Sequence, residues 1–570
     1  MSLITLSGFH GVVQITHPLM LPGDVGVAAT NCRPGTDDLR PWPLPTALAL
    51  AANTVIAGAQ SLYRFGRDLT TDPLYWMTFT QKADVVRGAI GSDSTERTYY
   101  TDGVTPKWVD NVFGFGAAPY PNNPRTLGVA YPSTAPTVAL ATAGTASTKE
   151  TRVYVWTWVT DKGEESAPSP PSTYSTLNST DATYNITFNE APPITFLDAY
   201  NTSLAWVGTM LYRRLYRTVT ASNGVTAYEL VAQITNLANG YVYADVVAAN
   251  ALGQIIPSLY WTPPPATLTG LIPMWNGMMA GFTGKTIWLC HPYVPYAWPR
   301  SYMLSVPEMI VGLSVWQQNL LVLTDGRPYL VTGTDPTTVS MQPIDANYAC
   351  ASRRSVCEIP AGCVWAAPEG LAYTGTRGSD MVTDLVFTKE QWQAYNPASM
   401  ITAHWGTYVI VFYNNGAPGG LVFDWSKANA VFPNKLKTHE VYPLNFGCDA
   451  AYRDPLSGNL YLLNGTTQTI SRWAAGAAGT ASFTSKLFRQ EAPTNFVWAQ
   501  VRADAYPVTL TVTADGVTRV NALAVTSQAP VPLPGGFKAR DWQITVTTSS
   551  NVQAVNLATS MHDLQRRQGK

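Results

Sequence analysis

The middle of this chain carries a weak repeat in which an aromatic residue accompanies a strand-like run. The repeat anchors, at intervals of 41, 49, 40 and 47 residues, are Trp275, Trp316, Trp365, Trp405 and Tyr452. A period of roughly 40–50 residues with several strands per unit is typical of a β-propeller. One such unit cannot bury its own faces, so the units pack around an axis, and an aromatic anchor supplies a large apolar contact between neighbouring sheets. Five anchors do not determine the number of blades.

Alternating runs rich in Val, Thr, Tyr and Trp extend over most of the chain and predict an all-β protein. Examples are residues 152–159, 319–324, 408–413 and 509–513. Asp-Gly or Asn-Gly pairs follow several of these runs, and they tolerate the positive φ that two-residue hairpins need. Helices are expected only at residues 47–59 and 388–395, and both are short.

Shifts in composition predict an interrupted propeller with two further β-domains. Residues 136–258 are rich in Thr, Ala, Ser and Tyr and contain short strands at the spacing of an immunoglobulin-like sandwich. The Gly-Glu-Glu-Ser-Ala-Pro-Ser stretch at 163–169 and the Leu-Tyr-Arg strand resemble a fibronectin type III module, which a propeller loop would accommodate as an insertion. The predicted division is 1–135 for the N-terminal part of the propeller, 136–258 for the inserted sandwich, 259–482 for the main blades and 483–570 for a small C-terminal β-domain.

The charge composition excludes several classes of protein. The 570 residues include 36 Lys+Arg and 37 Asp+Glu, a net charge of −1, and the charged fraction is 13% where roughly 25% is usual. Disorder is excluded because high net charge and low hydrophobicity are both absent. A free-standing nucleic-acid binder is excluded because no basic excess exists to displace counterions from phosphate. With 18 Trp, 29 Tyr and 17 Phe, a weakly charged surface predicts that part of it is buried in an assembly.

The sequence also bears on location. The first residues lack a basic segment and an apolar core, so no signal peptide is expected. The most apolar early stretch, residues 46–59, is too short to span a bilayer. The cysteines form no CxxC pair and are expected to be reduced, as in a chain that folds in cytosol. They are Cys32, Cys290, Cys350, Cys357, Cys363 and Cys448.

An ordered set of segments resembles the tail nozzle family of short-tailed bacteriophages, also called tail tubular protein B. The most specific pieces are Ala-Trp-Pro at 297–299 and Ser-Lys-Leu-Phe at 485–488. The other matching segments are 61–65, 84–88, 93–103, 106–107, 276–277, 291–296, 323–333, 473 and 556–560.

The resemblance implies a β-propeller with inserted and appended β-domains, in a homohexameric ring at the distal end of the tail. The ring would lie below the portal and adaptor, dock tail fibre or spike proteins, and channel and gate the exiting genome. Phage DNA would pass through the lumen without sequence-specific binding, and the protein, made in the host cytoplasm, would reside in the virion. The family is loose in sequence, so no gate or channel residue is assigned.

Metal and cofactor sites are not expected. The six histidines, which show no zinc-site spacing, are His10, His17, His291, His404, His439 and His562. Cys350, Cys357 and Cys363 also fit no common zinc module. Residues 281–286 end in Gly-Lys-Thr but lack the upstream glycine of a phosphate loop, and a hairpin turn is the expected structure.

Catalytic motifs are not expected either, and the chain is predicted not to be an enzyme. No GxSxG elbow occurs, and no sialidase Asp-box occurs. The acids weighed as a glycosidase pair are Glu308, Asp325, Glu369, Asp380 and Asp424. Two alternatives to the nozzle stay open, a propeller lectin that recognises host surface glycan and, ranked below it, a propeller hydrolase.

Overall fold

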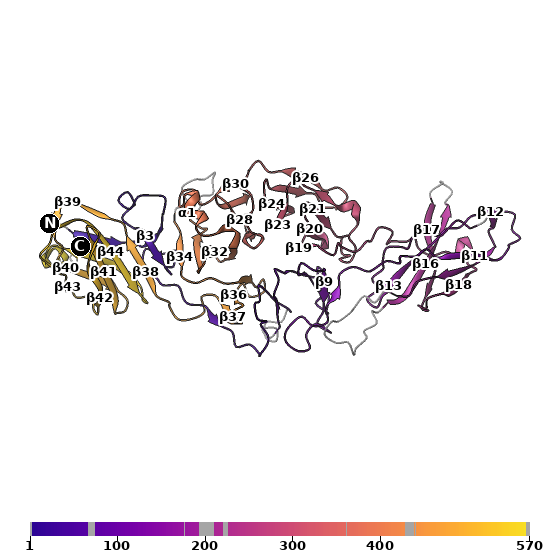
Figure 1. The fold of residues 1–570 in the computed structure, drawn as a ribbon, viewed down its shortest axis with the longest axis horizontal. Coiled ribbons are helices and arrows are strands. Elements are labelled where there is room, and N and C mark those ends of the chain that lie inside the picture. Colours follow the sequence, from indigo (N-terminus) through magenta and orange to yellow (C-terminus); the bar gives the residue numbers. More distant parts are fainter. Residues whose placement is uncertain are drawn as a thin grey trace. The chain divides into compact units, whose positions relative to one another are not determined.

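The computed structural model describes residues 3–66, 75–175, 177–192, 210–220, 226–360, 362–427, 438 and 440–565. The described chain is nearly all-β and is built from many small sheets, as the alternating sequence predicts (Figure 1). It divides into two compact units. The first comprises Met1–Thr80, Val311–Leu330 and Gln342–Lys570, and the second comprises Gln81–Ile310 and Val331–Met341.

Three four-stranded antiparallel sheets and one two-stranded sheet of the first unit follow one plan, in which strands pair in chain order. Their strands are β27 (Cys357–Ile359), β28 (Gly362–Ala367), β29 (Gly370–Gly375) and β30 (Gly378–Met381); β31 (Ile401–Trp405), β32 (Tyr408–Asn414), β33 (Pro418–Asp424) and β34 (Tyr442–Leu444); β35 (Ala450–Arg453), β36 (Leu460–Asn464) and β37 (Thr469–Arg472), with β4 (Thr46–Ala47); and β5 (Ser61–Arg64) with β6 (Trp76–Phe79).

The β35–β37 sheet takes its fourth strand from the beginning of the chain. Strand β4 pairs antiparallel with β37, placing Ala47 opposite Ser471 and Thr46 opposite Arg472. The next residue continues this contact, because the Leu48 N–H donates to the Ile470 carbonyl at 2.8 Å. An early segment therefore completes a sheet whose other strands lie more than 400 residues later in the sequence.

The sheets of the first unit are neighbours through their first strands. Strand β31 lies beside both β27 and β35, and β35 lies beside β5. Aromatic rings fill the gap between the last two sheets: Trp76 packs edge-on against Tyr461 at 4.8 Å and against Tyr452 at 6.1 Å between ring centroids. A further sheet, β23 (Ile310–Trp316), β24 (Asn319–Thr324), β25 (Tyr329–Thr332) and β26 (Ser340–Pro343), contains residues of both units.

The C-terminal strands of the first unit form two sheets that also contain the N-terminus. One sheet is β1 (Leu3–Ser7), β45 (Val552–Ala558), β40 (Trp498–Ala503) and β43 (Val531–Pro532). The other is β2 (His10–Val12), β3 (Val25–Thr30), β38 (Ala481–Ser485), β44 (Ala539–Thr548), β41 (Val508–Ala514) and β42 (Val517–Val525), with β39 (Phe488–Thr494) on β44.

This pairing differs from the expected boundaries, which put residues 1–135 together in the propeller. Strands β1 and β3 instead pair with strands from the last 90 residues of the chain, β1 with β45 and β3 with β38, and β2 pairs with β3. The physical reason is complementary alternation. In β1 the side chains of Ile4 and Leu6 point into the core, and β41 buries every second residue, so the two sheets close over one apolar interior.

In the second unit, two four-stranded sheets lie side by side. They consist of β7 (Asp84–Arg87), β8 (Thr98–Thr101), β9 (Lys107–Val109) and β10 (Arg125–Thr126), and of β19 (Thr269–Pro273), β20 (Met279–Thr283), β21 (Thr286–Leu289) and β22 (Leu304–Ser305). Their first strands again meet: β7 lies beside β19, and the Gly270 N–H donates to Asp84 Oδ2 at 2.9 Å.

Between these two sheets in the sequence lies a sandwich. Its sheets are β11 (Thr137–Thr142), β15 (Thr183–Phe188) and β18 (Tyr241–Asp245); β13 (Tyr154–Thr160), β16 (Met210–Thr220) and β17 (Thr226–Ile234); and the small pair β12 (Lys149–Glu150) and β14 (Asn178–Ser179). Aromatic side chains dominate the core between the sheets, with Trp156, Trp158 and Phe188 fully buried. The guanidinium of Arg213 is buried against these three rings at 4.6–5.2 Å from their centroids.

One edge of β13 is covered by a serine ladder, which we define as Ser166, Ser169, Ser172 and Ser175. Each serine N–H donates to the carbonyl of one residue in or just before β13. The Oγ of that serine accepts a hydrogen bond from the backbone N–H of the same partner residue. The partners of the four serines are, in order, Trp158, Trp156, Tyr154 and Arg152. The prolines in this segment lack N–H donors and cannot make a regular strand ladder, so a serine at every third position satisfies the edge instead.

The part of the chain that the structure describes contains few helices. They are α1 (Lys389–Gln393), α2 (Met561–Gln565) and the 3-10 turns Ala249–Ala251, Trp275–Gly277, Arg300–Tyr302, Arg353–Ser355 and Pro397–Ser399. The expected helix at 388–395 is present as α1, which Thr388 begins with a capping box. The expected helix at 47–59 is wrong: after β4 the chain turns, and Asn53 has φ +63°. Among the described residues no helix is long and apolar enough to cross a membrane.

Candidate functional site

The five repeat anchors occupy different positions in their sheets. Trp365 lies inside β28 and is fully buried, whereas Trp316 and Trp405 end the first strands β23 and β31 and are half-buried. Trp275 lies in the turn between β19 and β20. Tyr452 lies in β35, and its ring meets Tyr63 of the neighbouring sheet at 5.4 Å. The regular feature is thus the four-stranded sheet rather than the aromatic position.

Charged side chains meet where the first strands of the first unit run together. Arg354, just before β27, donates to the backbone carbonyl of Asp449 before β35 and to Ser61 Oγ of β5. Arg453 of β35 lies 3.3 Å from Nδ1 of His404 in β31. Burial and the nearby Arg453 lower the pKa of His404, so this contact does not need a charged imidazole. The Arg354 guanidinium therefore links the segment before β27 to β5 and to the segment before β35, which is a structural role.

The carboxylates weighed as a glycosidase pair lie in different sheets and turns. Asp325 follows β24, Asp380 lies in β30, and Glu308 precedes β23. Glu369 pairs with Lys389 at 3.0 Å on the surface, and Asp424 accepts from the Ser426 N–H at 3.1 Å, as a turn residue does. Glu369 and Asp424 therefore have separate partners, Lys389 and Ser426.

The Gly-Lys-Thr segment forms the hairpin that its sequence predicts. Thr283 of β20 pairs with Thr286 of β21, and Gly284 has φ +59°. Lys285 points away from any phosphate cradle, because its Nζ donates to the Pro307 carbonyl at 2.5 Å.

The cysteines are free thiols, and the described residues hold no group of three His, Cys, Asp or Glu side chains that could bind a metal ion. Burial raises the pKa of Cys32, Cys290, Cys350 and Cys363 to about 12. These thiols stay protonated at neutral pH and are poor nucleophiles. Of the six histidines, His439 lies outside the described residues.

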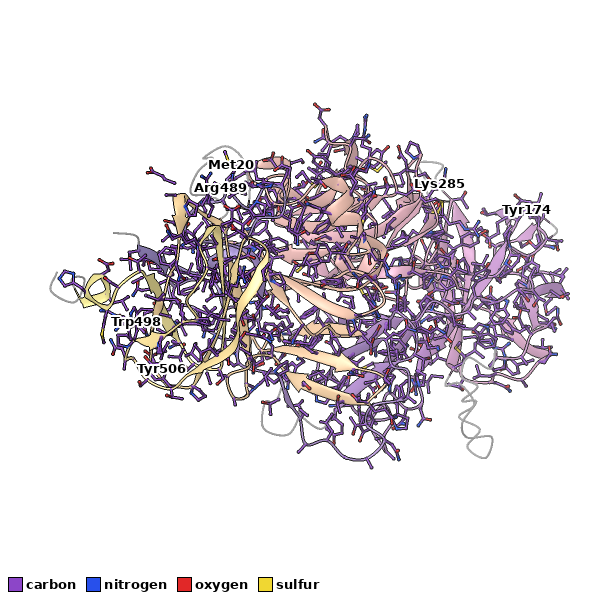
Figure 2. All side chains as sticks on the ribbon, turned by 60° about the vertical axis from the view of Figure 1, so that its left-hand side comes forward. Met20, Tyr174, Lys285, Arg489, Trp498 and Tyr506 are labelled. Atoms are coloured by element: carbon purple, nitrogen blue, oxygen red, sulfur yellow. The ribbon has the colours of Figure 1, made fainter. Side chains whose placement is uncertain are left out.

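Large apolar side chains are exposed on both units. In the first unit Met20 is 76% exposed, and in the second Tyr174 is 80% exposed; both project from the surface (Figure 2). The inserted sandwich is especially rich in them. Outside its undescribed segments, its exposed large apolar residues are Leu140, Tyr174, Leu177, Leu211, Val242, Val246 and Ile255. The sequence predicted covered apolar surface from composition alone but did not indicate that it would gather on this domain.

Comparison with known proteins adds no family. No family model matches the chain, and no curated protein matches it. Solved structures to which the chain is weakly similar include BBS1N in complex with ARL6DN (10% identity, 51% of this chain and 87% of that chain, TM-score 0.25), the N-terminal domain of Nup159 (6%, 58% and 86%, 0.22), and PorZ of the type-IX secretion system of Porphyromonas gingivalis (11%, 80% and 62%, 0.25). TM-scores this low do not establish a shared fold.

Proposed function

We propose that the chain is a structural virion protein, a tail nozzle subunit of a short-tailed phage. In this proposal six copies form a ring that channels and gates the exiting genome, and the ring docks to the adaptor and to tail fibres or spikes. The ordered sequence resemblance supports the family. The exposed apolar surface supports the assembly and is the single observation that carries the proposal.

The proposed fold is a β-propeller whose blades are small antiparallel sheets of the kind that each unit contains. Within the second unit, β7 adjoins β19, and the Ile310 N–H of β23 donates to Gly284 in the β20–β21 hairpin at 3.0 Å. Within the first unit, Leu321 and Leu323 of β24 share a core with Trp365 of β28, and first strands adjoin from β27 through β31 and β35 to β5. Strand β4 would close the ring by completing the β35 sheet, as a terminal strand does in propellers.

The argument for assembly is energetic. Apolar side chains that one subunit leaves in water gain free energy when a neighbouring subunit covers them. Burying a large aliphatic or aromatic side chain contributes about 1.5–3 kcal/mol. Tyr174, Val246 and Ile255 are each at least 60% exposed on one small domain, so a neighbouring subunit that covers them would gain several such contributions.

The charge balance suits a passage for DNA. Each phosphate that a protein neutralises adds affinity and would slow translocation. The whole chain has a net charge of −1. Gating would then be mechanical: loops of six subunits close the lumen, and contact with the host shifts them to a second packing.

Assembly state tests the proposal. Purified protein, alone or with its adaptor, should form a particle near six times 61.8 kDa by light scattering. A stable 61.8 kDa monomer that binds glycan arrays and never enters virions would favour the lectin. Turnover of a glycan that one acid substitution abolishes would favour the hydrolase.

A further inference from the structure

The second unit contains a cavity of about 550 Å³ that none of the functions above uses. Its walls come from four segments: the β7–β8 hairpin, the turn after β13, the loop before β20 and the loop after β21. The polar side chains that line it include Arg87, Asp93, Arg97, Lys162 and Glu164. A cavity of this size, with convergent polar groups among apolar ones, is typical of a small-molecule site.

An exposed aromatic ring stands at the edge of this cavity. Tyr293 is 59% exposed. Its backbone is left-handed, with φ +57°, which is uncommon for a bulky residue and costs free energy. The ring lies against Gly277, where an added Cβ would come within 2.5 Å of it. The fold therefore holds an aromatic face open toward the cavity at an energetic cost.

One cationic side chain on the cavity wall makes weaker polar contacts than the others. Arg97 pairs with Glu164 at 2.5 Å and stacks over Trp108 at 4.3 Å, and Lys162 lies 3.5 Å from an aspartate. Arg87 differs: its Nη2 is buried without a hydrogen-bond acceptor among the described residues, and the nearest carboxylate oxygen, on Glu96, is 3.8 Å away. A buried donor without an acceptor is costly, and a ligand oxygen would remove that cost.

We propose that this cavity binds an acidic saccharide, a pyranose unit that carries one carboxylate. The C–H face of the sugar stacks on Tyr293, and the carboxylate accepts from Arg87 Nη2 in a charge-assisted hydrogen bond. Asp93 lies on the same wall, where it accepts sugar hydroxyls. A nucleotide fits less well, because its several phosphate charges would face one available guanidinium. The proposal does not depend on ring assembly, since every wall residue belongs to one unit of one chain.

The test is a calorimetric titration of the full-length protein with two probes of equal length, an oligosaccharide of glucuronic acid and a neutral gluco-oligosaccharide. The acidic probe should bind and the neutral one should bind at least tenfold more weakly. Arg87→Gln should lower the affinity for the acidic probe by about ten- to hundredfold, the loss expected for one hydrogen bond to a charged group. Tyr293→Ala should lower the affinity for both probes. Tyr293→Phe should leave both affinities unchanged, because it retains the aromatic ring.

Two matched variants control for general damage. Tyr260→Ala removes a tyrosine of the same unit that is also more than half exposed but does not line the cavity, and Arg300→Gln removes an exposed arginine elsewhere; neither should change binding. Equal binding of acidic and neutral probes, tighter binding of a nucleotide, or no effect of Arg87→Gln and Tyr293→Ala would overturn the proposal. The mass of the assembled particle should be the same for all variants, which separates this test from that of the nozzle.

Discussion

Removing two steps of the serine ladder should open one edge of β13 in a residue-specific pattern. In the double variant Ser169→Ala, Ser172→Ala, the N–H groups of Trp156 and Tyr154 lose their Oγ acceptors, which lie at 3.2 and 3.0 Å. Both residues are fully buried, so water cannot replace the acceptors. An unsatisfied buried donor costs about 1–3 kcal/mol, which corresponds to roughly 5- to 150-fold faster amide exchange at each position.

The assay is hydrogen–deuterium exchange with mass spectrometry at single-residue resolution over 152–160. Exchange should accelerate at Tyr154 and Trp156, while Val155, which faces the β16 side of the strand, should change least. Thr173→Ala, an exposed neighbour in the same segment, is the matched control and should leave the whole strand protected. Unchanged exchange at both positions in the double variant, or equal acceleration along all of β13, would refute the idea that the ladder acts as a substitute strand.

Three further predictions concern the first unit. Arg64→Met breaks a buried ion pair with 3.3 Å between its charged atoms and should lower stability by about 3 kcal/mol in denaturant melts. Arg489→Met breaks the exposed pair with Asp541 and should lower stability far less (Arg489 is labelled in Figure 2); equal losses would contradict this account of burial. The hydrogen bond that the His10 imidazole donates to the Glu440 carboxylate raises the pKa of His10. Burial acts to raise the pKa of Glu440, but the hydrogen bonds that it accepts from His10 and Tyr442 lower that pKa. The protonated imidazole contributes its full stability below its ordinary pKa of 6.5, and the carboxylate contributes its full stability above its ordinary pKa of 4.5. His10→Ala should therefore lower the melting temperature most between pH 4.5 and 6.5 and least at pH 8. A loss that grows toward pH 8 would be evidence against the pair. Leu48→Pro removes the N–H that donates to β37 and should loosen the β35–β37 sheet, seen as faster proteolysis near residue 48; wild-type resistance would speak against a closing role for β4.

Local patterns predicted the local structure. The Gly-Lys-Thr hairpin and the helix that Thr388 begins follow from turn chemistry and from a capping box, which both act within a few residues. The helix predicted at 47–59 is wrong. The alanines of this segment favour a helix, but Leu48 instead extends a strand contact to β37, a partner far along the chain. Tertiary pairing outweighed propensity there.

Long-range pairing could not be predicted from local patterns. Thr5 donates to Asn556 at 3.0 Å across 551 positions, and no short motif encodes which strand β1 will choose. The cavity could not be predicted from local patterns either, because its wall combines Arg87, Lys162 and Tyr293 from three separate segments. The one local signal was a tyrosine between prolines at 292–295, which predicts a turn but not an open aromatic face.

The central claim is that this chain is a ring-forming structural subunit, and its mass in solution tests that claim most directly. Light scattering on the purified protein, alone and with the adaptor of the same phage, should give a particle near six times 61.8 kDa. The double variant Tyr174→Asp, Val246→Asp should return it toward one subunit, because both changes place a charge on exposed apolar positions of the sandwich. A mass of 61.8 kDa at every concentration, with and without the adaptor, would contradict the account.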